Sequence, residues 1–155
     1  MGADNVEELA AAAAGEEPLT AFLSAQLPDL AQVQGDQIAA AMGDLVSEVD
    51  RKALTDDVAE HTAEVFRAAV STGIADWRDD DLAFVRDWGF DLGAVRTPVS
   101  VWQGAQDRMV PYAHGQWLAG RLAGAVVHLE ADEGHLSLML DAFDAIVAEL
   151  AAHLA

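Results

Sequence analysis

One stretch of sequence, VWQGAQDRMVP at residues 101–111, decides the fold. Val99 to Gln103 is short and rich in residues that favour β-strands. The chain then enters a loop that carries Asp107, and Pro111 introduces a helix expected from about Tyr112 to Leu122. This pattern indicates a strand, a loop with a carboxylate, and a helix.

A second strand is predicted after that helix. It runs from Ala125 to Leu129, and it leads into the loop Ala131-Asp132-Glu133-Gly134-His135. A strand, a helix and a strand in this order form a crossover, which makes the two strands parallel. Because the carboxyl ends of neighbouring parallel strands share one edge of a sheet, we expect Asp107 and His135 to meet there. Beyond this loop an amphipathic helix is expected, since apolar residues recur at steps of four and three at Leu136, Leu140, Phe143, Val147, Leu150 and Leu154.

The first 90 residues are predicted to be helical, because nothing up to residue 70 alternates as a strand does. Asp4-Asn5-Val6-Glu7 has the spacing of a capping box, before an alanine-rich helix that Gly15 closes. Thr55 is predicted to be the N-cap of a later helix. Two more helices are expected, from Glu17 to about Val33 with Pro28 kinking or dividing it, and after Asp36.

The stretch Ser71 to Phe90 is predicted to be rich in loops. It contains Trp77, Trp88 and the acidic run Asp79-Asp80-Asp81. We interpret the acidic run as a helix start and a solvated turn. The two tryptophans are expected to pack in the core, with contact to a substrate as the alternative.

Composition excludes several classes of function. The chain has 27 acidic and 8 basic residues, a net charge of -19, and no cluster of Lys or Arg, so nucleic acid and anionic membranes are poor partners. It has no cysteine, which rules out disulfides and thiolate nucleophiles. No segment approaches the roughly 18 apolar residues of a membrane span, and the start lacks the basic flank of a signal peptide. The sequence predicts a soluble, cytoplasmic protein without a cofactor.

Asp107 and His135 are the candidate catalytic residues. A histidine can take a proton from a nucleophile and return it to a leaving group, while a carboxylate orients the ring and stabilises the imidazolium. The alternatives are that Asp107 is a turn or capping residue and that His135 is structural. No metal site is predicted, because the acids and histidines near His135 lack a ligand spacing that places three on one face.

At this point the residues resemble the C-terminal part of the α/β-hydrolase fold. The acid of that family follows a late strand in a pattern similar to Gly104-Ala105-Gln106-Asp107-Arg108-Met109-Val110-Pro111, and its histidine follows the last strand, as in Glu133-Gly134-His135-Leu136-Ser137. The match covers residues 95–155. The resemblance implies a predominantly helical α/β protein, with a helical cap-like region at 1–90 and a parallel β-α-β-α lobe at 91–155.

The family's nucleophile is not found in this sequence. None of the serines has the glycines on both sides that the G-x-S-x-G elbow requires, namely Ser24, Ser47, Ser71, Ser100 and Ser137. The resemblance implies hydrolysis of an ester, lactone, amide or related bond, with the acid and histidine supplied by this chain. Met109, Trp77 and Trp88 are candidates for the substrate pocket.

Two interpretations follow from the missing nucleophile. In the first, the chain is the cap and C-terminal lobe of a hydrolase, which needs an N-terminal half to act on a small-molecule substrate and is inactive in isolation. In the second, the chain is complete and is a non-catalytic binding or oligomerisation module derived from a hydrolase. In the first, the strand at Val99 to Gln103 lacks a neighbour, and we expect the chain to self-associate through that edge.

Overall fold

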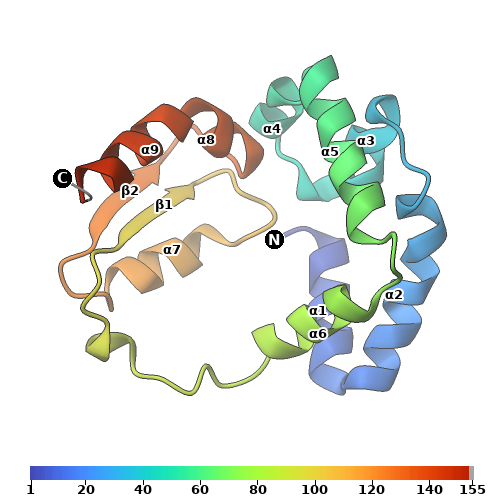
Figure 1. Ribbon diagram of the computed structural model, residues 1–155, viewed down its shortest axis with the longest axis horizontal. Helices are drawn as coiled ribbons and strands as arrows, with labels where there is room; N and C mark the ends of the chain where they lie inside the picture. The colour runs from blue at the N-terminus through green and yellow to red at the C-terminus, as the bar shows by residue number, and fades with distance from the viewer. Residues whose placement is uncertain (154–155) are drawn as a thin grey trace. The chain divides into compact units, whose positions relative to one another are not determined.

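The computed structural model describes residues 1–153 as a mostly helical chain with one small parallel sheet of two strands (Figure 1). The chain forms two compact units. The helical unit comprises Met1–Leu45 and Leu54–Phe90, and the sheet unit comprises Val46–Ala53 and the chain from Asp91 onward. Within residues 1–153, no helix is long and apolar enough to cross a membrane.

The helical unit confirms the predicted helices and corrects several of their details. Gly15 ends the first helix with a φ of 120°, but the N-cap is Gly2, and Asp4 lies in the first turn. Pro28 lies inside the second helix and does not divide it. Thr55 occupies the N-cap position of α5 as predicted. The elements are α1 (Ala3–Ala14), α2 (Glu16–Leu30), α3 (Gly35–Ala41), the 3-10 turn η1 (Gly43–Leu45), α5 (Asp56–Ala69) and α6 (Ala75–Phe84).

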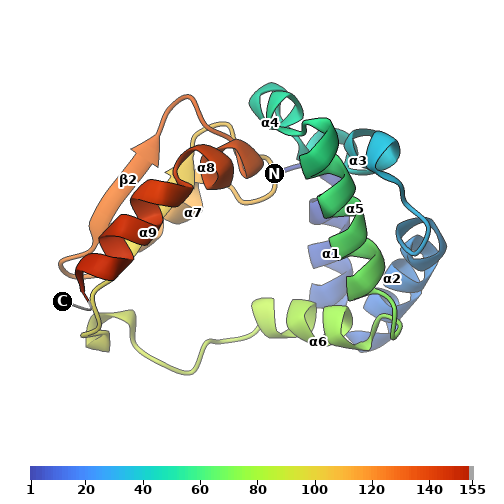
Figure 2. The ribbon, with the colours of Figure 1, turned by 45° about the horizontal axis from the view of Figure 1, so that its top comes forward.

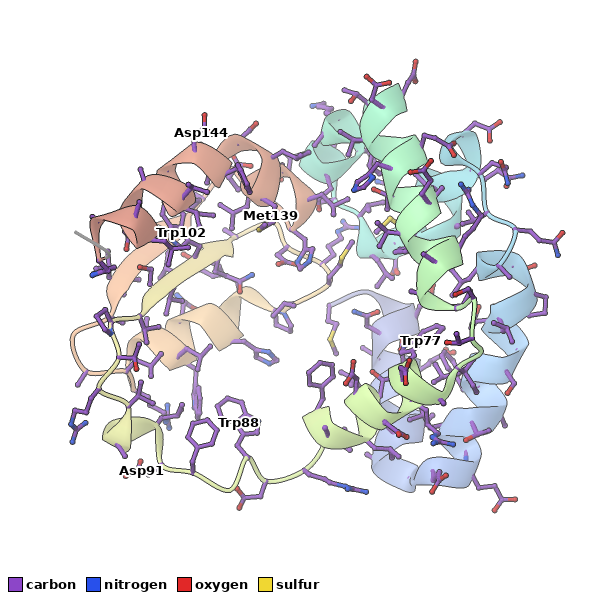
Figure 3. The ribbon with its side chains drawn as sticks, in the orientation of Figure 1. Trp77, Trp88, Asp91, Trp102, Met139 and Asp144 are labelled. Atoms are coloured by element: carbon purple, nitrogen blue, oxygen red, sulfur yellow. The ribbon has the colours of Figure 1, made fainter. Side chains whose placement is uncertain are left out.

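The acidic run was wrongly interpreted as a helix start and a turn. Asp79-Asp80-Asp81 lies inside α6, and Asp81 is only 6% exposed. Asp81 of α6 lies next to Glu8 of α1. Close by, Ala12 of α1 and Leu19 and Leu23 of α2 form a buried apolar cluster. Each of these leucines contributes about 1.5–3 kcal/mol through burial. Trp77 of α6 packs against this cluster, as expected of a core residue (Figure 3).

Two acids meet at the contact between α1 and α6. Glu8 accepts a hydrogen bond from Trp77 Nε1 at 2.6 Å. Burial raises the pKa of Asp81 to about 7, assisted by a hydrogen bond with Glu8 and by the negative charges of Glu8 and Asp80. Asp81 therefore favours its protonated form in the folded protein, because a second charge beside Glu8 would be poorly solvated.

The pKa of Asp81 predicts a pH-dependent loss of stability. A folded-state pKa above the unfolded value stabilises the protein below about pH 4, and this contribution is lost as the pH rises through about 7. Replacing Asp81→Asn should therefore raise the free energy of unfolding relative to wild type by more at pH 8 than at pH 5. The expected difference is on the order of 2 kcal/mol, measured by urea unfolding. Asp76→Asn, at an exposed position of the same helix, is the matched control, and an equal effect of both variants would contradict the prediction.

The sheet unit contains the predicted crossover. Strand β1 (Ser100–Gly104) pairs in parallel with β2 (Val126–Glu130), and Trp102 lies opposite His128. Helix α7 (Tyr112–Ala119) connects the strands. The single helix expected after His135 is two helices, because the chain breaks at Ala142 between α8 (Leu136–Asp141) and α9 (Phe143–Ala152). Leu154 lies outside the described residues. The unit also includes the 3-10 turn η2 (Leu92–Ala94) and α4 (Glu48–Ala53).

Helices α7 and α9 lie on opposite sides of the small sheet (Figure 2). Because side chains alternate along a strand, the two faces of β1 meet different helices. Gln103 packs closely against Gly115 of α7, where an added Cβ would lie 2.7 Å from that of Gln103. On the opposite face, Glu149 of α9 accepts a hydrogen bond from Ser100 and pairs with His128 Nε2 at 2.9 Å.

Trp102 lies on the face that α9 covers (Figure 3). Its ring stacks on His128 with a centroid distance of 3.6 Å. The two helices thus hold opposite faces of one short sheet.

Candidate active site

Asp107 lies in the loop that follows β1, and its side chain is almost completely buried. Its Oδ1 accepts hydrogen bonds from the backbone N–H groups of Met109 and Val110, both at 2.8 Å. Its Oδ2 accepts one from Gln103 Nε2 at 2.9 Å. The loop therefore wraps around the carboxylate and leaves Oδ2 directed toward a further partner.

That partner is His135. Its Nδ1 lies 2.9 Å from Oδ2 of Asp107, and 38% of its side chain is exposed. An ionised carboxylate only accepts hydrogen bonds, so Nδ1 is the donor. In the neutral ring Nε2 then carries the lone pair, and it is the nitrogen that can take a proton from another molecule. The structure thus brings together the two residues that the sequence singled out.

The electrostatics of the pair favour its charged form. Burial raises the pKa of Asp107, but the hydrogen bonds from His135 and from the backbone of Val110 and Met109 outweigh it, and the pKa is lowered. The hydrogen bond to Asp107 raises the pKa of His135 against the effect of burial, and the charges of Asp107 and Asp50 add to the increase. The pair therefore stabilises the fold most between pH 3.8 and 6.5, the ordinary pKa values of the two groups. This contribution declines below that range as Asp107 protonates and above it as His135 loses its proton.

A close backbone approach joins the loops that carry the two residues. A Cβ on Gly104 would lie 2.3 Å from the carbonyl oxygen of Gly134 and 2.4 Å from that of Glu133. Gln106 donates its N–H to the Glu133 carbonyl at 2.8 Å. Only glycine fits at the end of β1, because any side chain would push the two loops apart.

Asp50 is a residue that the sequence analysis missed. It lies on α4 and is completely buried. Its Oδ1 accepts from the N–H groups of Leu136 and Ser137, at 2.8 and 3.1 Å. Its Oδ2 accepts from the hydroxyl and the N–H of Ser47, at 2.7 and 3.2 Å. The spacing Ser47-x-x-Asp50 is a capping-box signal that could have predicted the start of α4, but it does not predict the contact with residues more than 80 positions later.

The weaker candidates are distributed over both units. Met109 lies beside the acid and contributes a backbone N–H to it. Trp77 and Trp88 belong to the helical unit, where Trp77 packs in the core and Trp88 stacks on Phe90 at 5.9 Å. Among residues 1–153, no three His, Cys, Asp or Glu side chains are grouped so that they could hold a metal ion.

The serine side chains of the sheet unit form hydrogen bonds with groups other than His135. Ser137 accepts from the N–H of Gly134 at 2.8 Å and is buried. Ser47 bonds to Asp50, and Ser100 bonds to Glu149. In the part of the chain that the structure describes, His135 has Asp107 as its side-chain hydrogen-bond partner and no serine in that role.

Comparisons with known proteins give no match to a family model, a curated protein or a solved structure. The α/β-hydrolase resemblance therefore remains a prediction from the sequence, and the geometry of the pair is the basis for any functional argument.

The geometry predicts that Asp107 controls the titration of His135. Replacing Asp107→Asn removes the charge that favours the imidazolium, so the pKa of His135 should fall. Proton NMR of the histidine ring signals between pH 4 and 9 measures this directly. The ring signals of His61, which lies exposed on α5, are the internal reference and should not differ between the two proteins. An unchanged pKa of His135 would mean that the pair does not form in solution.

Proposed function

We propose that Asp107 and His135 are the acid and the base of a Ser-His-Asp hydrolase site, and that this chain is the C-terminal part of an α/β-fold hydrolase. The observation that carries the proposal is the 2.9 Å contact between His135 Nδ1 and Asp107 Oδ2. Three further donors fix the carboxylate, and the ring remains partly exposed. A purely structural histidine would not need a partly exposed ring beside a buried, oriented carboxylate.

The chemistry follows from the protonation states. Nε2 of neutral His135 accepts the proton of a hydroxyl nucleophile as that oxygen attacks an ester, lactone or amide carbonyl. The imidazolium is stabilised by Asp107, which remains ionised, and it then protonates the leaving group. General base catalysis of this kind contributes about 10²–10⁴-fold in rate. The nucleophile is supplied by a segment other than the serines of this chain, and the substrate is a small molecule hydrolysed in the cytoplasm.

The proposal is tested on the coding sequence upstream of Met1. We expect an in-frame segment that encodes a strand, a G-x-S-x-G turn and a helix. The longer protein should hydrolyse p-nitrophenyl esters. His135→Ala should lower kcat about 10⁶-fold and Asp107→Asn about 10⁴-fold, the scale seen when triad members are removed from other enzymes. His61→Ala is the control, and it should leave kcat unchanged.

The 155-residue chain by itself should remain unlabelled by a fluorophosphonate, which modifies activated serines. Stoichiometric labelling of one serine would contradict the proposal. An open reading frame without the expected segment would also contradict it, and it would favour the second candidate function.

That second candidate is a non-catalytic binding or oligomerisation module, and the exposed apolar side chains of the sheet unit favour it. Val126 and Val127 of β2 are both more than 40% exposed. Apolar residues of the periodic pattern along α8 and α9 are also exposed, at Leu140, Phe143, Val147 and Leu150. Among residues 1–153 the sheet has only two strands, so each strand has an open edge. Open edges with apolar surface favour association.

Self-association is expected of the isolated chain on either proposal. Light scattering at micromolar concentration should give at least the mass of a dimer. Val127→Lys introduces a charge on β2 and should restore the monomer mass. Val65→Lys, at an exposed position of α5, is the matched control and should have no effect. A monomeric wild-type chain would exclude association through the sheet.

A further inference from the structure

We infer that Asp50 is a positioning residue for His135, which acts through the backbone of the loop at residues 133–137. The inference rests on the proposed function and deepens it, because it adds a second acid, Asp50, to the pair of Asp107 and His135 that the sequence singled out. Asp50 bonds to Ser47, Leu136 and Ser137, whereas the ring of His135 bonds to Asp107. Its role is to fix the segment from which the imidazole extends.

Hydrogen-bond donors surround both oxygens of Asp50. Its two oxygens accept four hydrogen bonds, two from the N–H groups of Leu136 and Ser137 and two from Ser47. The side chain is completely buried. A buried carboxylate persists only when donors compensate its charge, and here half of those donors belong to the two residues that follow His135.

His135 is the N-cap residue of α8, yet its side chain makes no capping hydrogen bond. The first N–H groups of a helix have no partner within the helix, and an Asp, Ser or Asn at the N-cap normally provides one. His135 instead directs its side chain to Asp107. Asp50 accepts the hydrogen bonds from the N–H groups of Leu136 and Ser137 in place of the histidine. The imidazole can therefore bond to Asp107.

Hydrogen bonds fix the loop on both sides of His135. Before it, the Glu133 carbonyl accepts from Gln106, and the Gly134 N–H donates to Ser137. After it, Leu136 and Ser137 donate to Asp50. A Cβ on Gly134 would lie 2.3 Å from Asp50 Oδ1, so the carboxylate sits directly against the loop. Catalytic groups need to be held within about 0.5 Å, and these contacts constrain the backbone of His135 from either side.

The charge of Asp50 supplies an effect that separates positioning from folding. Burial raises the pKa of Asp50, but the hydroxyl of Ser47 and the backbone N–H groups lower it further, so Asp50 is ionised. The acids that act on His135 are Asp107, from the loop after β1, and Asp50, from α4. Both raise the pKa of the imidazole. A residue that only stabilised the fold would leave this titration unchanged.

The test uses NMR on the 155-residue chain and two substitutions. Asp50→Asn retains an oxygen that can accept from Leu136 and Ser137 but removes the charge, and the pKa of His135 should fall. Asp50→Ala removes the acceptor as well, and the amide protons of Leu136 and Ser137 should exchange with solvent about tenfold faster or more. Asp81→Asn, which alters a buried acid in the helical unit, is the matched control and should change neither reading.

The outcomes separate this inference from the proposed function. An unchanged His135 pKa in Asp50→Asn, with wild-type exchange at Leu136 and Ser137, would overturn the positioning role. If Asp50→Ala fails to fold, the Asp50→Asn titration decides the matter. Neither reading requires hydrolytic activity, so failure of the ester assay would refute the proposed function and leave the contact between Asp50 and the histidine loop to be judged separately.

Discussion

The close approach between the end of β1 and the loop after β2 is the constraint on which the sheet unit depends. Gly104 lies so near the carbonyls of Glu133 and Gly134 that no side chain fits between them. This approach brings the loop of Asp107 and the loop of His135 into direct hydrogen bonding. Gly134 in turn leaves room for the carboxylate of Asp50 on its other side. The absence of side chains at Gly104 and Gly134 thus lets Asp107 reach the ring of His135 and Asp50 reach the backbone that follows it.

Three buried aspartates in this chain show that donors, more than burial, set the charge of an acid. Asp50, Asp81 and Asp107 are all at most 9% exposed. Asp50 and Asp107 have N–H, O–H or amide donors around both oxygens, and their pKa values are lowered despite burial. Oδ2 of Asp81 is buried with no hydrogen-bond partner among the described residues, and its neighbour is another acid. Its pKa is therefore raised. The two ionised acids are those that contact the candidate active site.

Local patterns explain which features the sequence could predict. The strands, their parallel arrangement and the meeting of Asp107 with His135 follow from short β-rich runs separated by a helix, and the structure shows all three. The burial of Asp81 depends on which face of α6 meets α1, and no local signal in an acidic run specifies that face.

The role of Asp50 was equally out of reach, because its partners lie 86 and 87 positions away in sequence. The break at Ala142 has a different origin. The apolar periodicity continues across it, so a pattern of side chains alone predicts one helix where the backbone forms two. The features that the sequence predicted are encoded within one strand-loop-helix unit. Those that it did not predict depend on contacts between distant elements or on a backbone break that the apolar pattern does not mark.

Both candidate functions require a partner that covers the exposed sheet, and only hydrolysis also requires a reactive Nε2 on His135. Parallel strands are normally covered on both faces and paired at their edges, whereas β2 exposes two valines and the sheet ends after two strands among the described residues. Another strand or another copy would bury that surface on either proposal.

Only hydrolysis needs Nε2 of His135 to remain accessible and neutral in a useful fraction of molecules. A module that only binds has no use for a buried, oriented acid beside a partly exposed imidazole, with a second, fully buried carboxylate bonded to the backbone that follows the histidine. The contacts of Asp107 and Asp50 around His135 therefore favour catalysis over binding alone. The exposed sheet favours a site that works as part of a larger assembly.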